Sequence, residues 1–200
     1  FMARAGAPAA PPAEDREAKR RAAGLLQSDF TRKILQDAEG RPLVSSEDLS
    51  AWAGRLSSEL YGRGEIVFRQ GAAGDCCYVV LAGTLAGRIH HRESGQETTF
   101  EVGPGAVVGE MSLMTGLPRM AELRARESAE LLRIPAPEFA ELLGKHEGLI
   151  EQMSRLVAER AQQNRRQYED LLAAGAAPVE QAISREGILK RFWRLLGGNK

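Results

Sequence analysis

The chain has 200 residues, of which 43% are apolar, and its 27 basic side chains balance its 27 acidic ones. This length and apolar content suit one packed domain with short appendages, whereas the lack of a basic excess argues against a dedicated nucleic-acid binder. The sequence contains no run of about 18 apolar residues, so it predicts no membrane span. Its first residues also lack the apolar core of a signal peptide. The adjacent Cys76 and Cys77 imply no disulfide framework, which fits a reducing compartment.

The N-terminal quarter of the chain divides by composition. Residues 1–13 are mostly Ala, Pro and Gly, and this composition predicts a disordered linker. Residues 14–56 are predicted to form a helical segment. Within it, the charged stretch 14–35 has apolar side chains at helical spacing, and Ser45 can cap a second, short helix.

The central part of the chain has a different texture, with short β-prone runs separated by glycine-rich turn signals. Several short strands at such spacing indicate an antiparallel sandwich or barrel. Strands and helices do not alternate here, so we do not expect a dinucleotide-binding Rossmann fold. The runs lie at residues 57–61, 65–68, 76–82, 84–91, 97–102, 106–108, 121–125 and 130–134.

Helical spacing returns after Pro135. A short helix is predicted over residues 137–146 and a long one over 148–172. We therefore expect one domain over residues 57–172, made of the strands and these two helices. The remainder, residues 173–200, is predicted to hold a short amphipathic helix near its end.

One segment, residues 103–123, lies within the strand-rich region but is not itself predicted to be a strand. Gly109 can adopt a positive φ, and residues 110–113 can form a helical turn whose first N–H groups make an anion cradle. The planar fork of Arg119 suits phosphate oxygens, and an ionised Glu110 can accept from a sugar hydroxyl. Together they predict a site for a phosphorylated ribose; the alternative is that Glu110 and Arg119 pair with each other.

Two sequence strings carry a resemblance to a known family. GEMSLMTGLPRMA, residues 109–121, resembles the phosphate-binding cassette of cyclic nucleotide-binding domains, and GRGEIVFRQGAAGDCCYVVLAG, residues 62–83, resembles the family's entry hairpin. The likeness runs from about residue 47 to 169. It implies a mainly β fold with flanking helices: an eight-stranded jelly-roll β-barrel with an N-terminal helical segment and C-terminal lid helices. Within the hairpin, Gly71, Gly74 and Asp75 would be structural turn residues.

The resemblance also implies a set of ligand-binding residues. Glu110 would take the ribose 2′-hydroxyl, and Arg119 would pair with the cyclic phosphate, supported by backbone groups of Ser112 and Ala121. In channel-type relatives an arginine on the lid helix reaches the base, and Arg160 falls at that position. The full set implied is Gly109, Glu110, Met111, Ser112, Arg119, Met120, Ala121 and Arg160.

Two positions depart from the family pattern. Val108 stands where an aromatic residue is common, and Met120 stands where Ser, Thr or Ala usually follows the arginine. Because a thioether cannot donate to the guanine edge, we expect cyclic AMP to be preferred over cyclic GMP. We also expect the long helix to move as a lid when ligand binds.

The sequence offers little support for catalysis or for a metal. Ser112 has no base near it in sequence and no nucleophile elbow, so we expect no enzyme activity, no catalytic residues and no cofactor beyond the regulatory nucleotide. His90–His91 and Cys76–Cys77 are adjacent pairs, and consecutive strand residues point to opposite faces, so neither pair can bind one ion as a unit.

Three classes of parent protein could carry such a domain: a membrane channel, a transcription regulator, and a free-standing or enzyme-attached regulatory subunit. A degenerate domain that only binds a partner is a further alternative. Residues 173–200 contain no helix-turn-helix, so the transcription-regulator class fails unless the chain is truncated at this end. The cassette, AERAQQ and ILKRFWRLLGG together resemble the cytosolic C-terminal part of bacterial mechanosensitive-type cyclic nucleotide-gated channels.

That resemblance implies a domain on the cytoplasmic side of the inner membrane, tethered through a preceding portion, because Phe1 ahead of Met2 suggests a cut chain. The implied partners are a cyclic mononucleotide, channel subunits and further copies in a homo-oligomer, without nucleic acid. Phe192 and Trp193 would contact either a membrane surface or a partner, or else dock on this domain's own surface, which we favour.

Overall fold

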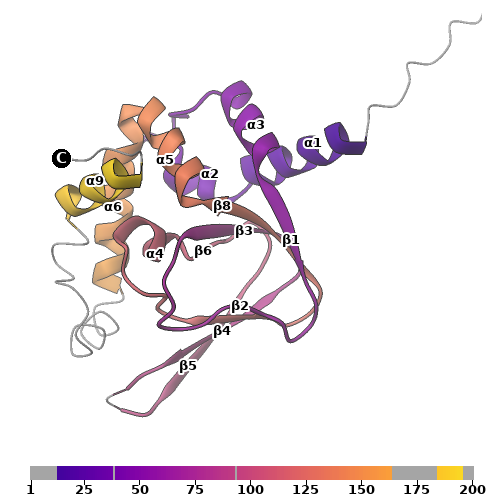
Figure 1. Cartoon of the computed structure of the whole chain (residues 1–200), viewed down its shortest axis with the longest axis vertical. Coiled ribbons are helices and arrows are strands. Elements are labelled where there is room, and N and C mark those ends of the chain that lie inside the picture. Colours follow the sequence, from indigo (N-terminus) through magenta and orange to yellow (C-terminus); the bar gives the residue numbers. More distant parts are fainter. Residues whose placement is uncertain (1–12, 38, 93, 164–183, 196–200) are drawn as a thin grey trace, which may run out of the picture.

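The computed structural model describes residues 13–37, 39–92, 94–163 and 184–195, and its strands form two four-stranded antiparallel sheets (Figure 1). The first sheet has the order β1–β8–β3–β6, with bounds Ser57–Tyr61, Ala129–Pro135, Cys76–Ala82 and Val107–Val108. The second has the order β2–β7–β4–β5, with bounds Ile66–Phe68, Glu122–Ala125, Leu85–His90 and Glu97–Val102. The expected mainly β barrel with flanking helices is confirmed.

Strand β3 explains how the two layers form. Its first five residues are all buried, as an unbroken apolar run predicts for a strand covered on both faces. Cys77 and Val79 pack under the helices, whereas Cys76, Tyr78 and Val80 pack inside the barrel. By contrast, β4 alternates buried with partly or fully exposed residues, because one face of the second sheet meets solvent. The core therefore has two parts, divided by the first sheet.

The N-terminal helices cover the outer face of the first sheet (Figure 1). They are α1 (Ala13–Leu26), α2 (Asp29–Ile34) and α3 (Ser46–Arg55). The expectation of one helical stretch over residues 14–35 is wrong, because Ser28 begins a new helix: its hydroxyl accepts from the Thr31 N–H, and the Asp29 N–H donates to Gly105 O at 2.7 Å. The predicted Ser45 cap is present on α3.

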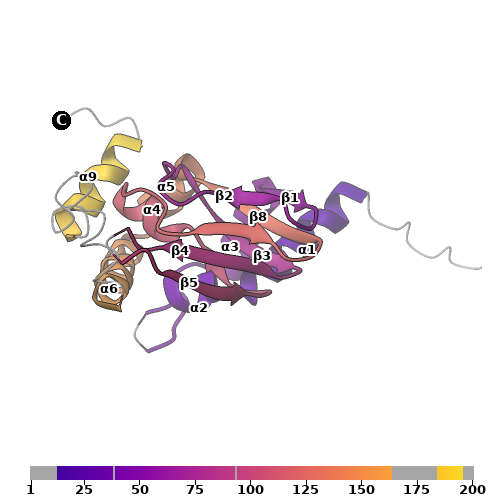
Figure 2. The same ribbon diagram turned by 90° about the horizontal axis from the view of Figure 1, so that it is seen from below.

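The helices that follow the barrel gather at one end, opposite α1 (Figures 1 and 2). They are α5 (Ala136–Lys145), α6 (Glu147–Gln163) and α9 (Arg185–Leu195), and the short α4 (Glu110–Thr115) lies beside them. Helix α6 buries Leu149, Met153 and Val157, which follow the predicted apolar side. The predicted linker before residue 13, the continuation of the long helix to 172, and the side chains of Phe192 and Trp193 lie outside the described residues.

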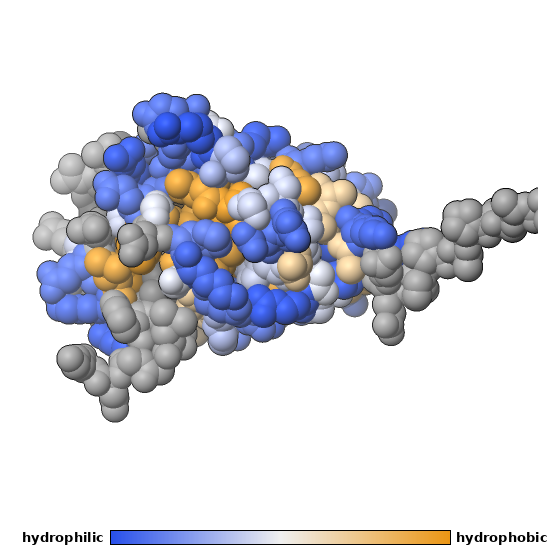
Figure 3. Space-filling model, turned by 90° about the horizontal axis from the view of Figure 1, so that it is seen from above, coloured by the Kyte–Doolittle hydropathy of each residue, from blue (hydrophilic) through white to orange (hydrophobic). Residues whose placement is uncertain are grey.

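The outer surface is mostly polar. Seen from above (Figure 3), hydrophilic side chains cover much of the visible face, with hydrophobic ones showing between them. Leu60, on the edge strand β1, is the most exposed large hydrophobic residue of the described chain, at 78% exposure. Among the described helices, none combines the length and apolar character that a membrane-crossing segment needs.

Candidate functional site

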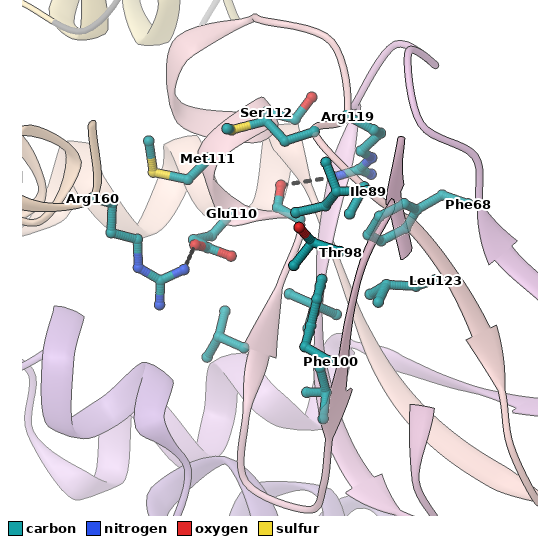
Figure 4. Close-up of a pocket in the computed structure, with 16 residues that line it drawn as sticks. Phe68, Ile89, Thr98, Phe100, Glu110, Met111, Ser112, Arg119, Leu123 and Arg160 are labelled. Carbon is teal, nitrogen blue, oxygen red and sulfur yellow. Dashed lines mark hydrogen bonds and ion pairs between the residues drawn. The ribbon is translucent and has the colours of Figure 1, made fainter. Parts of the chain in front are cut away.

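A cavity of about 440 Å³ opens between α4, the inner face of the β4–β5 hairpin and the end of α6 (Figure 4). Gly109, with φ of +79°, precedes α4, and Gly116, with φ of +76°, follows it. These left-handed conformations, which glycine adopts without steric cost, turn the chain abruptly on both sides of α4. All six residues of α4 are buried, and the first three, Glu110, Met111 and Ser112, form part of the cavity wall.

The guanidinium of Arg119 lies in this wall and is 3% exposed. Its Nη1 donates to Gly109 O at 2.7 Å and its Nη2 to Cys76 O at 2.8 Å, while the ring of Phe68 lies 4.4 Å from its Cζ. Its Nε is buried without a hydrogen-bond partner, and Arg119 makes no ion pair within the described part of the chain. Its Nη2 also lies 3.6 Å from Cys76 Sγ. None of these described partners carries a negative charge, and a buried cation without a counter-charge favours an anion beside it.

The loop between β2 and β3 holds Arg119 in place. The Gly71 N–H donates to Arg119 O and the Arg119 N–H donates to Ala72 O, both at 2.7 Å. A Cβ at Gly74 would lie 2.3 Å from the Ser112 hydroxyl and 3.0 Å from Arg119 Cζ. Only glycine therefore allows this loop to pack so closely against the site.

Glu110 is 3% exposed and forms an ion pair with Arg160 of α6. Burial raises the pKa of Glu110 above its ordinary value, while the positive charges of Arg160 and Arg119 oppose that shift. The alternative that Glu110 and Arg119 pair with each other is wrong, because each has different partners: Arg160 for Glu110, and backbone carbonyls for Arg119.

The structure brings the predicted site residues together at this one cavity. Its lining includes Gly109, Glu110, Met111, Ser112, Arg119, Met120, Ala121 and Arg160. Arg160 does come from the helix expected to act as the lid, but its described partner is the carboxylate of Glu110. Whether each residue contacts a ligand stays a prediction.

Sequence reasoning missed the opposite wall. Figure 4 shows Ile89, Thr98, Phe100 and Leu123 facing the cavity from β4, β5 and β7. In β5 the inward positions alternate through Thr98, Phe100 and Val102, so the period of two could have assigned them to one face. It could not have shown that this face borders the cavity.

The cysteine and histidine pairs border the cavity without lining it: Cys76 O accepts from Arg119, and His91 contacts Thr98. Cys76 and Cys77 are both buried and pack into different parts of the core. His91 Nε2 lies 2.9 Å from the Thr98 hydroxyl, and the His90 N–H is bound by Gln70 Oε1 at 2.8 Å. The described residues contain no group of three His, Cys, Asp or Glu side chains placed to hold a metal.

Comparison with known proteins finds matches to the part of the chain that contains α4 and Arg119. Residues 58–146 match the family model described as the cyclic nucleotide-binding domain. Among curated proteins, lysophospholipase nte1 of Emericella nidulans is 36% identical over 98 residues, and that of Aspergillus terreus is 34% identical over 97. Each match covers 48% of this chain but only 6% of the relative, so the chain corresponds to a small part of those enzymes.

Solved structures share the fold. The catabolite activator protein of Thermus thermophilus superposes with a TM-score of 0.54 at 24% identity, covering 77% of this chain and 84% of that one. The regulatory subunit of a cAMP-independent protein kinase A from Trypanosoma cruzi, bound to guanosine, gives a TM-score of 0.60 at 21% identity, covering 82% and 53%. Residues 58–146 thus match the cyclic nucleotide-binding domain family in sequence, and the chain has the fold of solved cyclic nucleotide-binding proteins.

Proposed function

We propose that this chain is a regulatory domain that binds a cyclic mononucleotide in the cavity beside α4. The observation that carries the proposal is the state of Arg119, whose guanidinium is buried, positively charged and without an ion pair in the described chain. A cyclic phosphate bears one negative charge, and the fork of one arginine matches it in charge and shape.

The rest of the cavity suits the remaining parts of such a ligand. The carboxylate of Glu110 can accept a hydrogen bond from a ribose hydroxyl. Because Glu110 is buried, a ligand without that hydroxyl would leave the carboxylate with one hydrogen bond fewer, which favours ligands that carry a ribose. Ile89, Phe100 and Leu123 provide an apolar wall for a base. The volume of about 440 Å³ falls within the usual range of small-molecule sites, which runs from about 300 to 1,000 Å³.

We further propose that cyclic AMP is the preferred ligand. Met120 lines the cavity directly after Arg119, and its sulfur is at most a weak acceptor. Guanine would leave polar edge groups without a partner there, at a cost of about 1–3 kcal/mol. Adenine makes fewer demands, and a thioether packs well against an aromatic face.

We propose two alternative effectors that the domain could control, a membrane channel or an enzyme, and each has its own support. The resemblance stated from the sequence favours a membrane channel, with the domain tethered on the cytoplasmic side of the inner membrane and α6 transmitting the movement. The curated matches to lysophospholipases favour an enzyme-attached regulatory domain instead. Sequencing the coding region on both sides of this chain distinguishes the two. A channel requires membrane-spanning segments, whereas a lysophospholipase requires a catalytic domain.

Calorimetric titration with cyclic AMP and cyclic GMP tests the proposal. Arg119→Ala should weaken binding by about 2–5 kcal/mol, or roughly 30- to 5,000-fold, since it removes the charge that meets the phosphate. Arg155→Ala is the matched control, because Arg155 is an exposed arginine of α6 whose partner is Glu151, one turn away. Binding that is equal in both variants, or absent from the wild type, contradicts the proposal.

A further inference from the structure

Helix α9 packs on the domain far along the chain from the cassette. It contacts α4, α5 and α6, and Figures 1 and 2 both place it at the end of the barrel that carries these helices. Ile188 anchors it: this side chain is fully buried and belongs to the same core cluster as Leu113 and Met114 of α4. The segment expected to contact either a partner or its own domain therefore docks, over its described residues, on its own domain.

Arg191 of α9 contacts the backbone behind the cavity. Its Nε donates to Leu113 O at 2.6 Å, and its Nη2 donates to Gly74 O at 3.3 Å. A Cβ at Gly116 would lie only 2.6 Å from Arg191 Nη1, so the guanidinium lies directly against the end of α4. Leu113 O is among the last carbonyls of α4, which lack partners within the helix and favour a cation.

Both acceptors belong to segments that form the site. Leu113 follows Ser112 in α4, and Gly74 lies behind Ser112 and Arg119 at near-contact distance. Arg191 itself does not line the cavity. It is half-buried, burial and the nearby Arg194 lower its pKa, and it makes no ion pair within the described chain. Its guanidinium thus joins α4 to the β2–β3 loop from outside the cavity.

We infer that docking of α9 and ligand binding are coupled through Arg191, which acts as a positioning residue. The inference rests on the proposed function. Arg191 holds α4 and the Gly74 turn in the arrangement that aligns Ser112 and Arg119, so displacement of α9 lowers affinity for the nucleotide. Because such coupling is reciprocal, bound nucleotide strengthens the docking of α9. A partner that displaces α9 would in turn lower the affinity of the site for the nucleotide.

The test compares two arginines of one helix in the full chain. Arg191→Ala should weaken cyclic AMP binding about tenfold, within the range of about 5- to 150-fold usual for coupled sites. Arg194→Ala removes the same charge from an exposed position and should change affinity less than about twofold. Arg191→Lys, which keeps the charge but cannot reproduce the fork, should give an intermediate affinity. Circular dichroism verifies that each variant is folded.

Hydrogen exchange provides the readout that a merely structural role would not move. Saturating cyclic AMP should slow exchange at residues 186–194 in the wild type and much less in Arg191→Ala. Wild-type affinity in Arg191→Ala, or equal loss in both alanine variants, overturns the coupling while leaving the proposed function intact. Absence of any binding by the wild type overturns the proposed function and the coupling with it.

Discussion

The carboxylate of Glu110 and the guanidinium of Arg160 form an ion pair that joins the cassette helix α4 to α6. Glu110 is buried, whereas the Arg160 side chain is 28% exposed, so the pair lies at the boundary between cavity and solvent. In the proposed complex the same carboxylate accepts from the ribose. In that proposed complex, the ligand and α6 would therefore contact the same carboxylate, so binding would change the surroundings of Arg160.

A double-mutant cycle measures this ion pair. Arg160→Ala leaves a buried carboxylate without its partner, whereas Glu110→Gln combined with Arg160→Ala removes both charges. We expect the double variant to be at least as stable as Arg160→Ala alone, with a coupling energy of about 1 kcal/mol from urea unfolding. Strictly additive effects would show that the pair contributes nothing to stability. Glu151→Ala with Arg155→Ala, an exposed pair of the same helix, is the control and should show a coupling near zero.

The raised pKa of Glu110 predicts a pH dependence of stability. In the unfolded chain this carboxyl loses its proton near 4.5, whereas in the folded chain it does so at higher pH because it is buried. The folded state binds the proton more tightly, so the contribution of Glu110 to the free energy of unfolding grows as pH falls from 7 through the raised pKa toward 4.5. It is lost again as pH rises.

Urea unfolding of the wild type and Glu110→Gln across that range checks the sign. The stability of the wild type relative to the variant should increase toward low pH, since glutamine does not titrate. A relative stability that decreases toward low pH would mean that the pair with Arg160 outweighs burial.

Gly74→Ala tests how closely the β2–β3 loop packs behind the site. The new Cβ would lie 2.3 Å from the Ser112 hydroxyl, so Ser112 and Arg119 must shift. We expect a loss of about 1–3 kcal/mol in stability, as for overpacking, and a clear loss of nucleotide affinity. Gly103→Ala is the control, because nothing lies within 4 Å of its added Cβ and its φ is not positive. Thermal unfolding and calorimetry of both variants decide the matter; similar behaviour of the two would refute this role of Gly74.

Met120→Thr tests the origin of base preference. A hydroxyl directly after Arg119 can meet the guanine edge, so this change should improve cyclic GMP binding by roughly 5- to 150-fold relative to cyclic AMP. Met120→Leu, which offers neither donor nor acceptor, should leave the preference unchanged. Competition of the two nucleotides for each protein gives the ratio directly. Tighter binding of cyclic GMP by the wild type would show that another residue reads the base.

The strands and the cassette follow from local sequence. Every predicted β-prone run contains a strand, because a period of two and glycine turns depend only on neighbouring residues. The same holds for α4, which begins after Gly109 and ends before Gly116, where the backbone needs a positive φ. Arg119 lies close enough in sequence to this turn for its position in the site to be predicted.

The other contacts were decided by tertiary structure. Arg160 is 50 residues from Glu110, and Arg191 is 78 residues from Leu113. Periodicity assigns a side chain to a face of its own helix or strand, but not to the element that will lie opposite. That choice depends on how the two sheets close and how α6 and α9 pack against them, which is a property of the whole core. For this reason the pairing of Arg160 with Glu110, the wall formed by Thr98 and Phe100, and the docking of α9 on the cassette emerged only from the folded chain.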